Sequence, residues 1–241
     1  MTVDRSAAAP PPRAHPDLVD RFLRYWVLWV TLGETVGFAA PALAQLAFAG
    51  SPVATAALIL AGAVEGAVLG WTQATVLRVV LPALDRSRWV GATALGAAAA
   101  WFVGLLPAEW ADVWQRWPTV AQLVTAALLA TFLLCTLGFA QWFELRRHLP
   151  SAGWWIAGSA AAWCAGLTVF FAVATPLWQP GQSAALVLAI GLLAAVLMAL
   201  AMAVVSGVVL RTLLRHARSG SRRHIRRRDH PAGGESPSQT A

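Results

Sequence analysis

The stretch SAALVLAIGLLAAVLMALAMAVVSGVVL, residues 183–210, decides the fold class of this chain. It is apolar on every face of a helix and contains no charged residue. A transmembrane helix needs about 20 consecutive apolar residues, whereas a strand of a transmembrane barrel alternates apolar and polar positions over about 10 residues. We therefore predict that this stretch crosses a membrane as a helix.

The rest of the chain has the same apolar character. Of its 241 residues, 58% are hydrophobic and only 12% are charged, where a soluble domain carries roughly 25% charged residues. Apolar blocks bounded by charges or prolines predict an all-α fold, an integral membrane bundle of six transmembrane helices. The predicted spans are residues 22–48, 53–80, 89–106, 118–143, 153–175 and 183–210.

The basic residues are all arginines, and all but Arg116 lie on one side of these predicted spans. Arg116 stands in the connection 107–117 together with Glu109 and Asp112. The other arginines concentrate in residues 1–24, 78–88 and 146–147 and in the C-terminal tail, whereas the connections 49–52 and 176–182 carry no charge. Positive residues gather on the cytoplasmic side of membrane helices. We therefore expect a multi-pass protein of the bacterial inner membrane with both termini in the cytoplasm.

The two ends of the chain are expected to lie outside the membrane. Residues 1–21 predict a flexible cytoplasmic segment, residues 22–214 the transmembrane domain, and residues 215–241 a disordered basic tail. Anionic lipid headgroups are the predicted partners of this charge, and no motif for specific nucleic-acid binding accompanies it. The arginines expected to contact lipid headgroups are Arg78, Arg146, Arg147, Arg211 and Arg215.

Three tryptophans stand between the third and fourth predicted spans. Trp110, Trp114 and Trp117 follow a helical spacing. Because indoles prefer the headgroup region, they predict a short helix at the external surface of the membrane. A binding surface for an external lipid or glycan is the alternative interpretation.

An internal repeat groups the six spans into three tandem helical hairpins, at about 22–80, 89–143 and 153–210. The even-numbered spans end in the pattern G-x-x-Q-x-x-x-L-R, which the last span keeps in weakened form, and the odd-numbered spans begin with a tryptophan followed by a hydroxyl residue. Three parallel hairpins favour a bundle with pseudo-threefold character. The repeated residues are Gly70, Gln73, Leu77 and Arg78; Gly138, Gln141, Leu145 and Arg146; Ala203, Ser206, Leu210 and Arg211; Trp26, Trp89 and Trp155; and Thr31, Thr93 and Ser159.

These elements resemble those of a widespread group of uncharacterised bacterial membrane proteins, which carry repeated G-x-x-Q-W-x-x-L-R elements followed by a W-W-I or W-V helix start. The best matches are QWFELR at 141–146 and WWI at 154–156, whereas Ala74 replaces the tryptophan that should follow Gln73. The resemblance covers residues 62–215. It implies a membrane fold and location but no activity.

Two acidic residues, Glu34 and Glu65, stand in the middle of the first and second spans at similar depth. An ionised carboxylate is costly there and usually faces the bundle interior. Neither acid recurs in the other hairpins, where Leu133 and Met198 occupy the position of Glu65. The pair predicts either a proton or cation pathway through the first hairpin or protonated carboxyl groups that hydrogen-bond between helices.

The repeated polar residues Gln73, Gln141 and Ser206 lie about one turn inside the cytoplasmic ends of their spans. Their side chains are expected either to bond between helices or to line an inner vestibule. Glu144 and His148, helical neighbours at the same membrane edge, are interpreted as part of a solvated turn.

Residues that could support catalysis are scarce within the spans. All five histidines lie outside them, so no buried serine–histidine pair can form, and no H-E-x-x-H or phosphate-binding motif occurs. We therefore expect no enzyme activity, no cofactor and no metal site. Two functions stay open: a structural or interaction bundle that assembles with itself or another membrane protein, and a small proton- or cation-coupled transporter or channel that uses Glu34 and Glu65. An enzyme that acts on lipid at the cytoplasmic face is a third alternative.

Overall fold

The computed structural model describes residues 17–229. This part of the chain contains six helices that are long and apolar enough to cross a membrane, the first of them broken into two. The prediction of an all-α bundle of six spans is confirmed. The helices are α1 (Asp17–Gly37), α2 (Ala39–Phe48), α3 (Ala54–Val80), α4 (Arg86–Glu109), α5 (Ala111–Trp114), α6 (Thr119–Leu145), α7 (Trp154–Leu177) and α8 (Ala184–Asp229).

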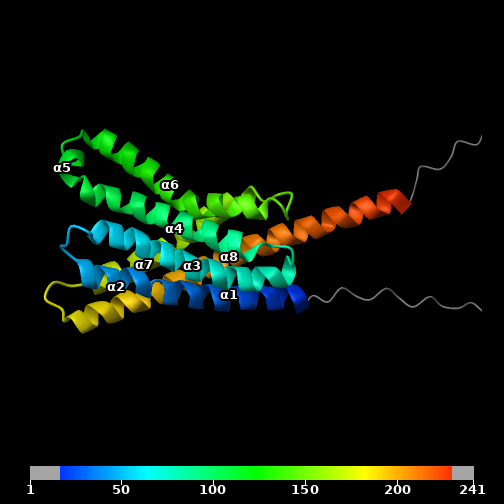
Figure 1. Cartoon of the computed structure of the whole chain (residues 1–241), viewed down its shortest axis with the longest axis horizontal. Helices are drawn as coiled ribbons and strands as arrows, with labels where there is room; N and C mark the ends of the chain where they lie inside the picture. Colours follow the sequence, from blue (N-terminus) through cyan, green and yellow to red (C-terminus); the bar gives the residue numbers. More distant parts are fainter. Residues whose placement is uncertain (1–16, 230–241) are drawn as a thin grey trace, which may run out of the picture.

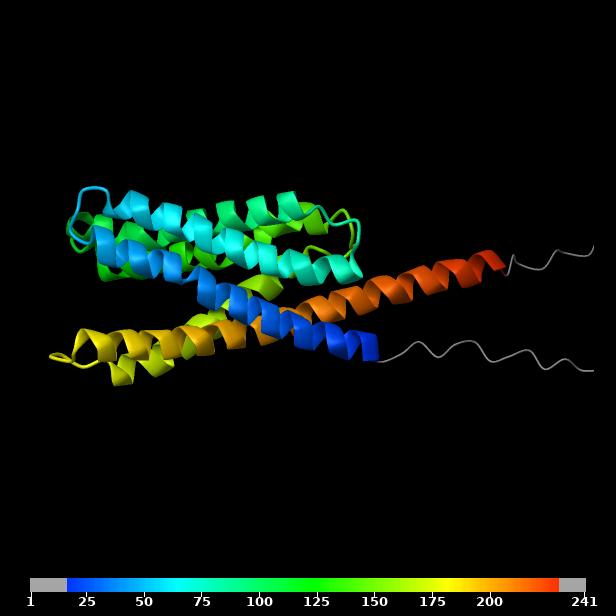
Figure 2. The ribbon, with the colours of Figure 1, turned by 60° about the horizontal axis from the view of Figure 1, so that its bottom comes forward.

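The six spans run alongside one another (Figures 1 and 2), and their contacts join them into a ring. Each span packs on the next one along the chain, and the ring closes where α8 packs on α1. The connections α3–α4 and α6–α7 lie at the same end of the bundle as the start of α1 and the last turns of α8. We call this the terminal end and the opposite one the far end.

The first span is bent instead of continuous. α1 ends at Gly37 and α2 begins at Ala39, with a break at Phe38. Pro41 explains the break, because it has no N–H to donate and its ring clashes with the carbonyl four residues earlier, that of Gly37. The bend therefore lies one turn beyond Glu34.

α8 is longer than predicted. The prediction of a disordered tail from residue 215 is wrong over its first part, because α8 continues as a helix to Asp229. Extending an existing helix needs no new nucleus, and leucine and arginine have high helix propensity. The prediction of a flexible segment over residues 1–21 is likewise wrong for its last part, since α1 begins at Asp17. The remaining terminal residues, 1–16 and 230–241, lie outside the described chain.

The tryptophan-rich connection at the far end contains a helix of only four residues, α5. Trp117 lies beyond this helix, with its ring 5.9 Å from that of Trp114. Trp110 and Trp117 are exposed, as residues that anchor at headgroup level would be. The predicted short helix is therefore present, but it does not carry all three indoles.

Tryptophans fill the centre of the ring in its terminal half. Trp26, Trp89 and Trp155 are each at most 1% exposed. The ring centroid of Trp155 lies 6.3 Å from that of Trp26 and 6.4 Å from that of Trp89. Trp155 of the third hairpin therefore contacts the corresponding tryptophan of each of the other two hairpins.

Candidate functional site

Each central tryptophan hydrogen-bonds to a repeated polar residue of the neighbouring hairpin. In each case the indole N–H of a tryptophan in the first helix of one hairpin donates to a side-chain oxygen in the second helix of a neighbouring hairpin. All three junctions between hairpins therefore contain the same kind of hydrogen bond. The pairs are Trp89 with Gln73 (3.1 Å), Trp155 with Gln141 (2.9 Å) and Trp26 with Ser206 (3.1 Å).

Gln141 lies at the centre of this network. Its amide N–H groups donate to Gln73 Oε1 at 2.8 Å and to Thr93 Oγ1 at 3.0 Å. Its own oxygen accepts from Trp155, and every member of the group is buried. The structure thus places the repeated glutamines in contacts between helices at the terminal half of the bundle.

In the first hairpin, the hydroxyl residue of the repeat, Thr31, does not occupy the position that Thr93 occupies in the second. Val30, four residues after Trp26, occupies the position that corresponds to Thr93 and is fully buried. The Thr31 hydroxyl is buried without a hydrogen-bond partner among the described residues. The first hairpin therefore lacks one polar member of the network.

Glu34 and Glu65 lie in one cavity on the far-end side of the central tryptophans. The cavity has a volume of about 450 Å³ and is lined by residues from all six spans. Both side chains are buried, and their carboxyl groups are close enough to interact electrostatically. Leu133 and Met198, which the repeat aligns with Glu65, line the same cavity. The acids among the residues that line this cavity therefore come from the first hairpin alone.

The two carboxyl groups have different surroundings. Glu65 Oε2 accepts a 2.8 Å hydrogen bond from the indole N–H of Trp101. Glu34 is 1% exposed, and the group in the described chain that its carboxyl can hydrogen-bond to is the carboxyl of Glu65, which requires one of the two acids to hold a proton. Burying an unpaired carboxylate costs many kcal/mol. Glu34 therefore needs a proton or a bound cation to be neutral in this position.

Close approach of the helices positions these acids. A Cβ atom at Gly37, beside the bend in the first span, would lie 3.0 Å from the backbone oxygen of Glu65. A Cβ atom at Gly62, three residues before Glu65, would lie 2.0 Å from the ring of Trp101. The absence of side chains at these two glycines lets the helices approach and lets Trp101 reach the carboxyl group of Glu65.

Aromatic side chains that the sequence analysis did not single out form much of the cavity wall. They are Phe38, Trp101, Trp163, Phe170 and Phe171. Trp163 stands in the middle of the predicted span 153–175 and Trp101 five residues inside the end of the span 89–106, both deeper than the headgroup level where indoles usually lie. Their depth within the predicted spans is the sequence feature that could have identified these two tryptophans as candidate site residues.

The cavity is open on one side. Figure 2 shows α7 and the first part of α8 diverging from the other spans toward the far end. In the described chain α2 packs on α3 and makes no extensive contact with α8. Of the lining residues, Gly104 and Phe171 are exposed. Part of the cavity wall is therefore formed by exposed residues, whereas Glu34 and Glu65 themselves are buried.

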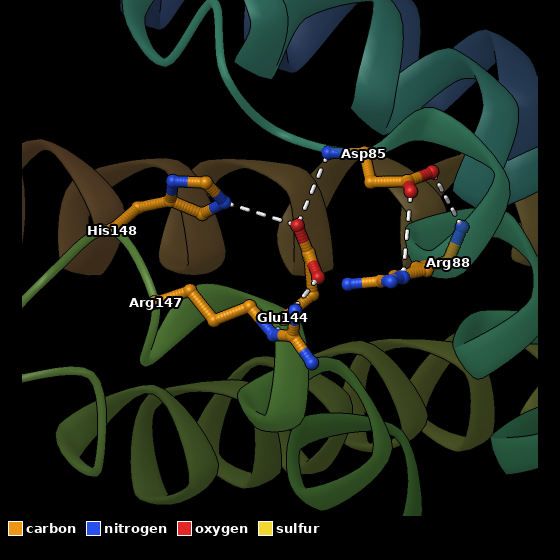
Figure 3. Close-up of polar contacts among 5 residues, drawn as sticks. All are labelled: Asp85, Arg88, Glu144, Arg147 and His148. Atoms are coloured by element: carbon orange, nitrogen blue, oxygen red, sulfur yellow. Dashed lines mark hydrogen bonds and ion pairs between the residues drawn. The ribbon is translucent and has the colours of Figure 1, made fainter.

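A second polar cluster joins the two connections at the terminal end (Figure 3). Glu144 Oε1 accepts from the backbone N–H of Asp85 at 3.1 Å and lies 3.0 Å from His148 Nε2, while Arg147 Nε is 3.6 Å from Oε2. Asp85 in turn caps α4 by accepting from the backbone N–H of Arg88 at 3.1 Å. The interpretation as a solvated turn is wrong for Glu144, which is 4% exposed, because the connection before α4 covers it.

The arginines predicted at lipid headgroups all lie at the terminal end. Arg78, Arg146 and Arg147 are exposed there. Arg211 and Arg215 line a pocket between α1, α3 and α8. These arginines therefore lie at the ends of the apolar spans, where lipid headgroups are expected.

The closed ring of six apolar helices around a buried polar core defines an integral membrane bundle. No family model, curated protein or solved structure matches the chain. Within residues 17–229, no three His, Cys, Asp or Glu side chains are grouped to hold a metal ion. The chemistry of the site is therefore inferred from its own geometry.

Proposed function

We propose that the protein is a small transporter in which Glu34 and Glu65 carry protons or other cations. The observation that supports this most strongly is that two buried acids, Glu34 and Glu65, face each other in one central cavity, where they can bond only by sharing a proton. Ionisable residues inside membrane bundles commonly mark proton or ion pathways.

Charge balance supports the same proposal. Two neighbouring carboxylates repel each other, and each loses hydration on burial. The described residues that line the cavity include no basic side chain. The compensating charge must therefore come from a proton or from a cation that enters the cavity.

The position of the cavity favours alternating access over an open channel. The three central tryptophans lie between the cavity and the terminal end, about two helical turns from Glu34. The break at Phe38 lies beside Glu34 and offers a place where the first span can change direction. Passage to the terminal end would require the tryptophans to move.

Flux measurements in liposomes test the proposal. The purified protein is reconstituted, a membrane potential is imposed, and the entry of protons is followed with an internal pH dye; sodium and potassium gradients are tested in the same way. We expect flux in the wild type and a loss of at least tenfold in Glu34→Gln and in Glu65→Gln. Asp112→Asn, which removes an exposed acid of α5, is the matched control and should retain wild-type flux.

Two results would overturn transport through this pair. Wild-type protein that moves none of the three ions above the level of empty liposomes contradicts the function. Unchanged flux in both glutamine variants shows that the ions take another route. Thermal melting of each variant in detergent establishes that a loss of flux does not result from unfolding.

A structural or interaction bundle is the second candidate function. The buried network of tryptophans and glutamines favours it, because such bonds hold one arrangement of the hairpins. In that role the glutamate variants would change the melting temperature or the oligomeric state and would have no flux to lose. Crosslinking in native membranes measures assembly with itself or with another membrane protein.

We also propose that the terminal end faces the cytoplasm of a bacterial cell and that the protein lies in the inner membrane. The concentration of arginines at that end supports this orientation, as does the resemblance to bacterial membrane proteins with the repeated G-x-x-Q-W-x-x-L-R element. Fusions of a cytoplasmic and an external reporter to the C-terminus measure it. An externally active reporter contradicts the orientation.

A further inference from the structure

The cavity that contains Glu34 and Glu65 offers few ligands for an inorganic metal cation. Among the described residues that line it, the polar side-chain groups are the two carboxyl groups and the indole N–H groups of Trp101 and Trp163. Hard metal cations are held in proteins by about six or more oxygen ligands, and indole N–H groups only donate. The two acids therefore lie in a site that suits a cation without a fixed shell of oxygen ligands.

Aromatic rings form much of the wall around the two acids. The face of an aromatic ring attracts a cation within about 6 Å, most strongly where water is excluded, and clusters of rings recognise quaternary ammonium groups. Carboxyl groups surrounded by rings therefore match a positive group that is attached to an apolar body. The rings belong to Phe38, Trp101, Trp163, Phe170 and Phe171.

The size of the cavity also indicates an organic molecule. Its volume of about 450 Å³ lies within the roughly 300–1,000 Å³ that is usual for small-molecule sites. Protein interiors are otherwise close-packed, with few voids larger than a water molecule. A pathway for protons alone would not need a space of this size between all six spans.

The charge of the two acids fits one positive charge. Without a cation the pair is neutral when each carboxyl group holds a proton, which avoids a buried unpaired charge. When one monovalent cation enters, one of these protons leaves to water and the other stays between Glu34 and Glu65, so the total charge is again zero. Among the described residues that line the cavity from the six spans, no further side chain can gain or lose a proton.

Building on the transport function proposed above, we infer that this cavity binds a monovalent organic cation with an apolar body, of the quaternary ammonium class, in exchange for one proton. The positive group lies beside the carboxyl groups of Glu34 and Glu65, and the apolar body lies against the aromatic rings. The cation is thus the substrate that competes with protons for the pair.

Isothermal titration calorimetry of the detergent-purified full chain with benzyltrimethylammonium tests this inference. The compound keeps its charge at every pH, and neopentylbenzene is the matched ligand of nearly the same shape without the charge. We expect one cation bound per chain and one proton released, counted from titrations in buffers of different ionisation enthalpy. The affinity should rise by up to tenfold for each unit of pH, and neopentylbenzene should bind at least tenfold more weakly.

Variants of the acids test where the cation binds. Glu34→Gln and Glu65→Gln should each weaken the binding of benzyltrimethylammonium at least tenfold. Glu144→Gln is the matched control, because it alters a buried acid outside the cavity, and it should bind the cation as the wild type does. Thermal melting of each variant establishes that a loss of binding does not result from unfolding.

A variant of the cavity wall separates the organic cation from the proton. A Cβ atom at Gly104 would lie 3.4 Å from Cδ1 of Leu133, an ordinary contact, so Gly104→Leu adds a side chain beside the cavity without separating the helices. It should weaken the binding of benzyltrimethylammonium at least fivefold and retain proton flux in liposomes. Gly91→Leu on the same helix, where no atom lies within 4 Å, should change neither.

The outcomes distinguish this inference from the proposed function. Equal binding of neopentylbenzene, or cation binding that releases no proton, would overturn the inference. Wild-type protein that moves protons in liposomes and does not bind benzyltrimethylammonium would also overturn it and would leave proton transport intact. Binding with release of one proton in a protein that shows no ion flux would support the cation site and contradict transport.

Discussion

The indole N–H of Trp26 in the first helix donates a 3.1 Å hydrogen bond to the hydroxyl of Ser206 in the last helix. Both side chains are buried. The equivalent junctions between the other hairpins use Gln73 and Gln141, whose amides can also link to each other. The junction between the first and last helices therefore has fewer hydrogen bonds between side chains than the other two junctions.

Ser206→Ala should destabilise the bundle modestly, because the indole N–H of Trp26 loses its acceptor. Hydrogen bonds between membrane helices contribute about 0.6 kcal/mol on average, and equilibrium unfolding in mixed micelles measures a change of this size. Thr212→Ala is the control on the same helix, since the Thr212 hydroxyl bonds only to the carbonyl of Val208 within α8. Equal losses for the two variants would show that Ser206 contributes nothing to closure.

Gln141→Leu should cost more than Ser206→Ala, because it removes bonds to three buried partners, Gln73, Thr93 and Trp155. An unsatisfied buried polar group costs about 1–3 kcal/mol. The melting temperature in detergent measures the loss. Gln122→Leu, which removes an exposed amide that bonds only to backbone carbonyls of its own connection, should leave it nearly unchanged. A Gln141→Leu protein as stable as the wild type would contradict the importance of the network.

Gly66→Ala and Gly91→Ala should have opposite effects on stability. A Cβ atom at Gly66 would lie 2.5 Å from that of Ala97 and 2.7 Å from the backbone oxygen of Thr93, so α3 and α4 must separate. Overpacking of this kind costs about 1–3 kcal/mol. At Gly91 no atom lies within 4 Å, and alanine should stabilise α4 by up to about 1 kcal/mol through its helix propensity. Unfolding curves for both variants decide this, and a tolerated Gly66→Ala would disprove the tight α3–α4 contact.

Glu144→Ala should loosen the connection before α4, because the backbone N–H of Asp85 loses its acceptor. Hydrogen exchange followed by mass spectrometry should show faster exchange at residues 81–88 and little change in the far half. Glu144→Gln keeps a side-chain oxygen in place, so it should restore most of the protection while removing the ion pair with Arg147. Equal exchange in the alanine variant and the wild type would mean that other contacts hold this connection.

Much of the fold could be predicted from the sequence, because crossing a membrane depends on a local property. Each predicted span coincides with a helix to within a few residues at most boundaries. The bend in the first span was also accessible, since Pro41 stands inside the apolar block. The extension of α8 was not, because composition describes what a segment does alone and not what it does when attached to an existing helix.

The repeated tryptophans and glutamines could be identified from their spacing, but their partners could not. The spacing places Trp89 and Gln73 at the same end of neighbouring spans without stating which way each side chain points. The rotation of each helix about its own axis depends on packing against its neighbours. That rotation turns Trp101 toward Glu65 and brings Glu34 beside the same carboxyl group.

The sequence by itself determined that the chain forms six helices long and apolar enough to cross a membrane, and it predicts their grouping into three related hairpins, because hydropathy and residue spacing act within each segment. Only the tertiary structure decided three further features: the shared cavity of Glu34 and Glu65, the burial of Glu144, and the arginine-lined pocket beside Tyr25. Each depends on contacts between helices distant in the chain, and such contacts follow from how the whole ring closes.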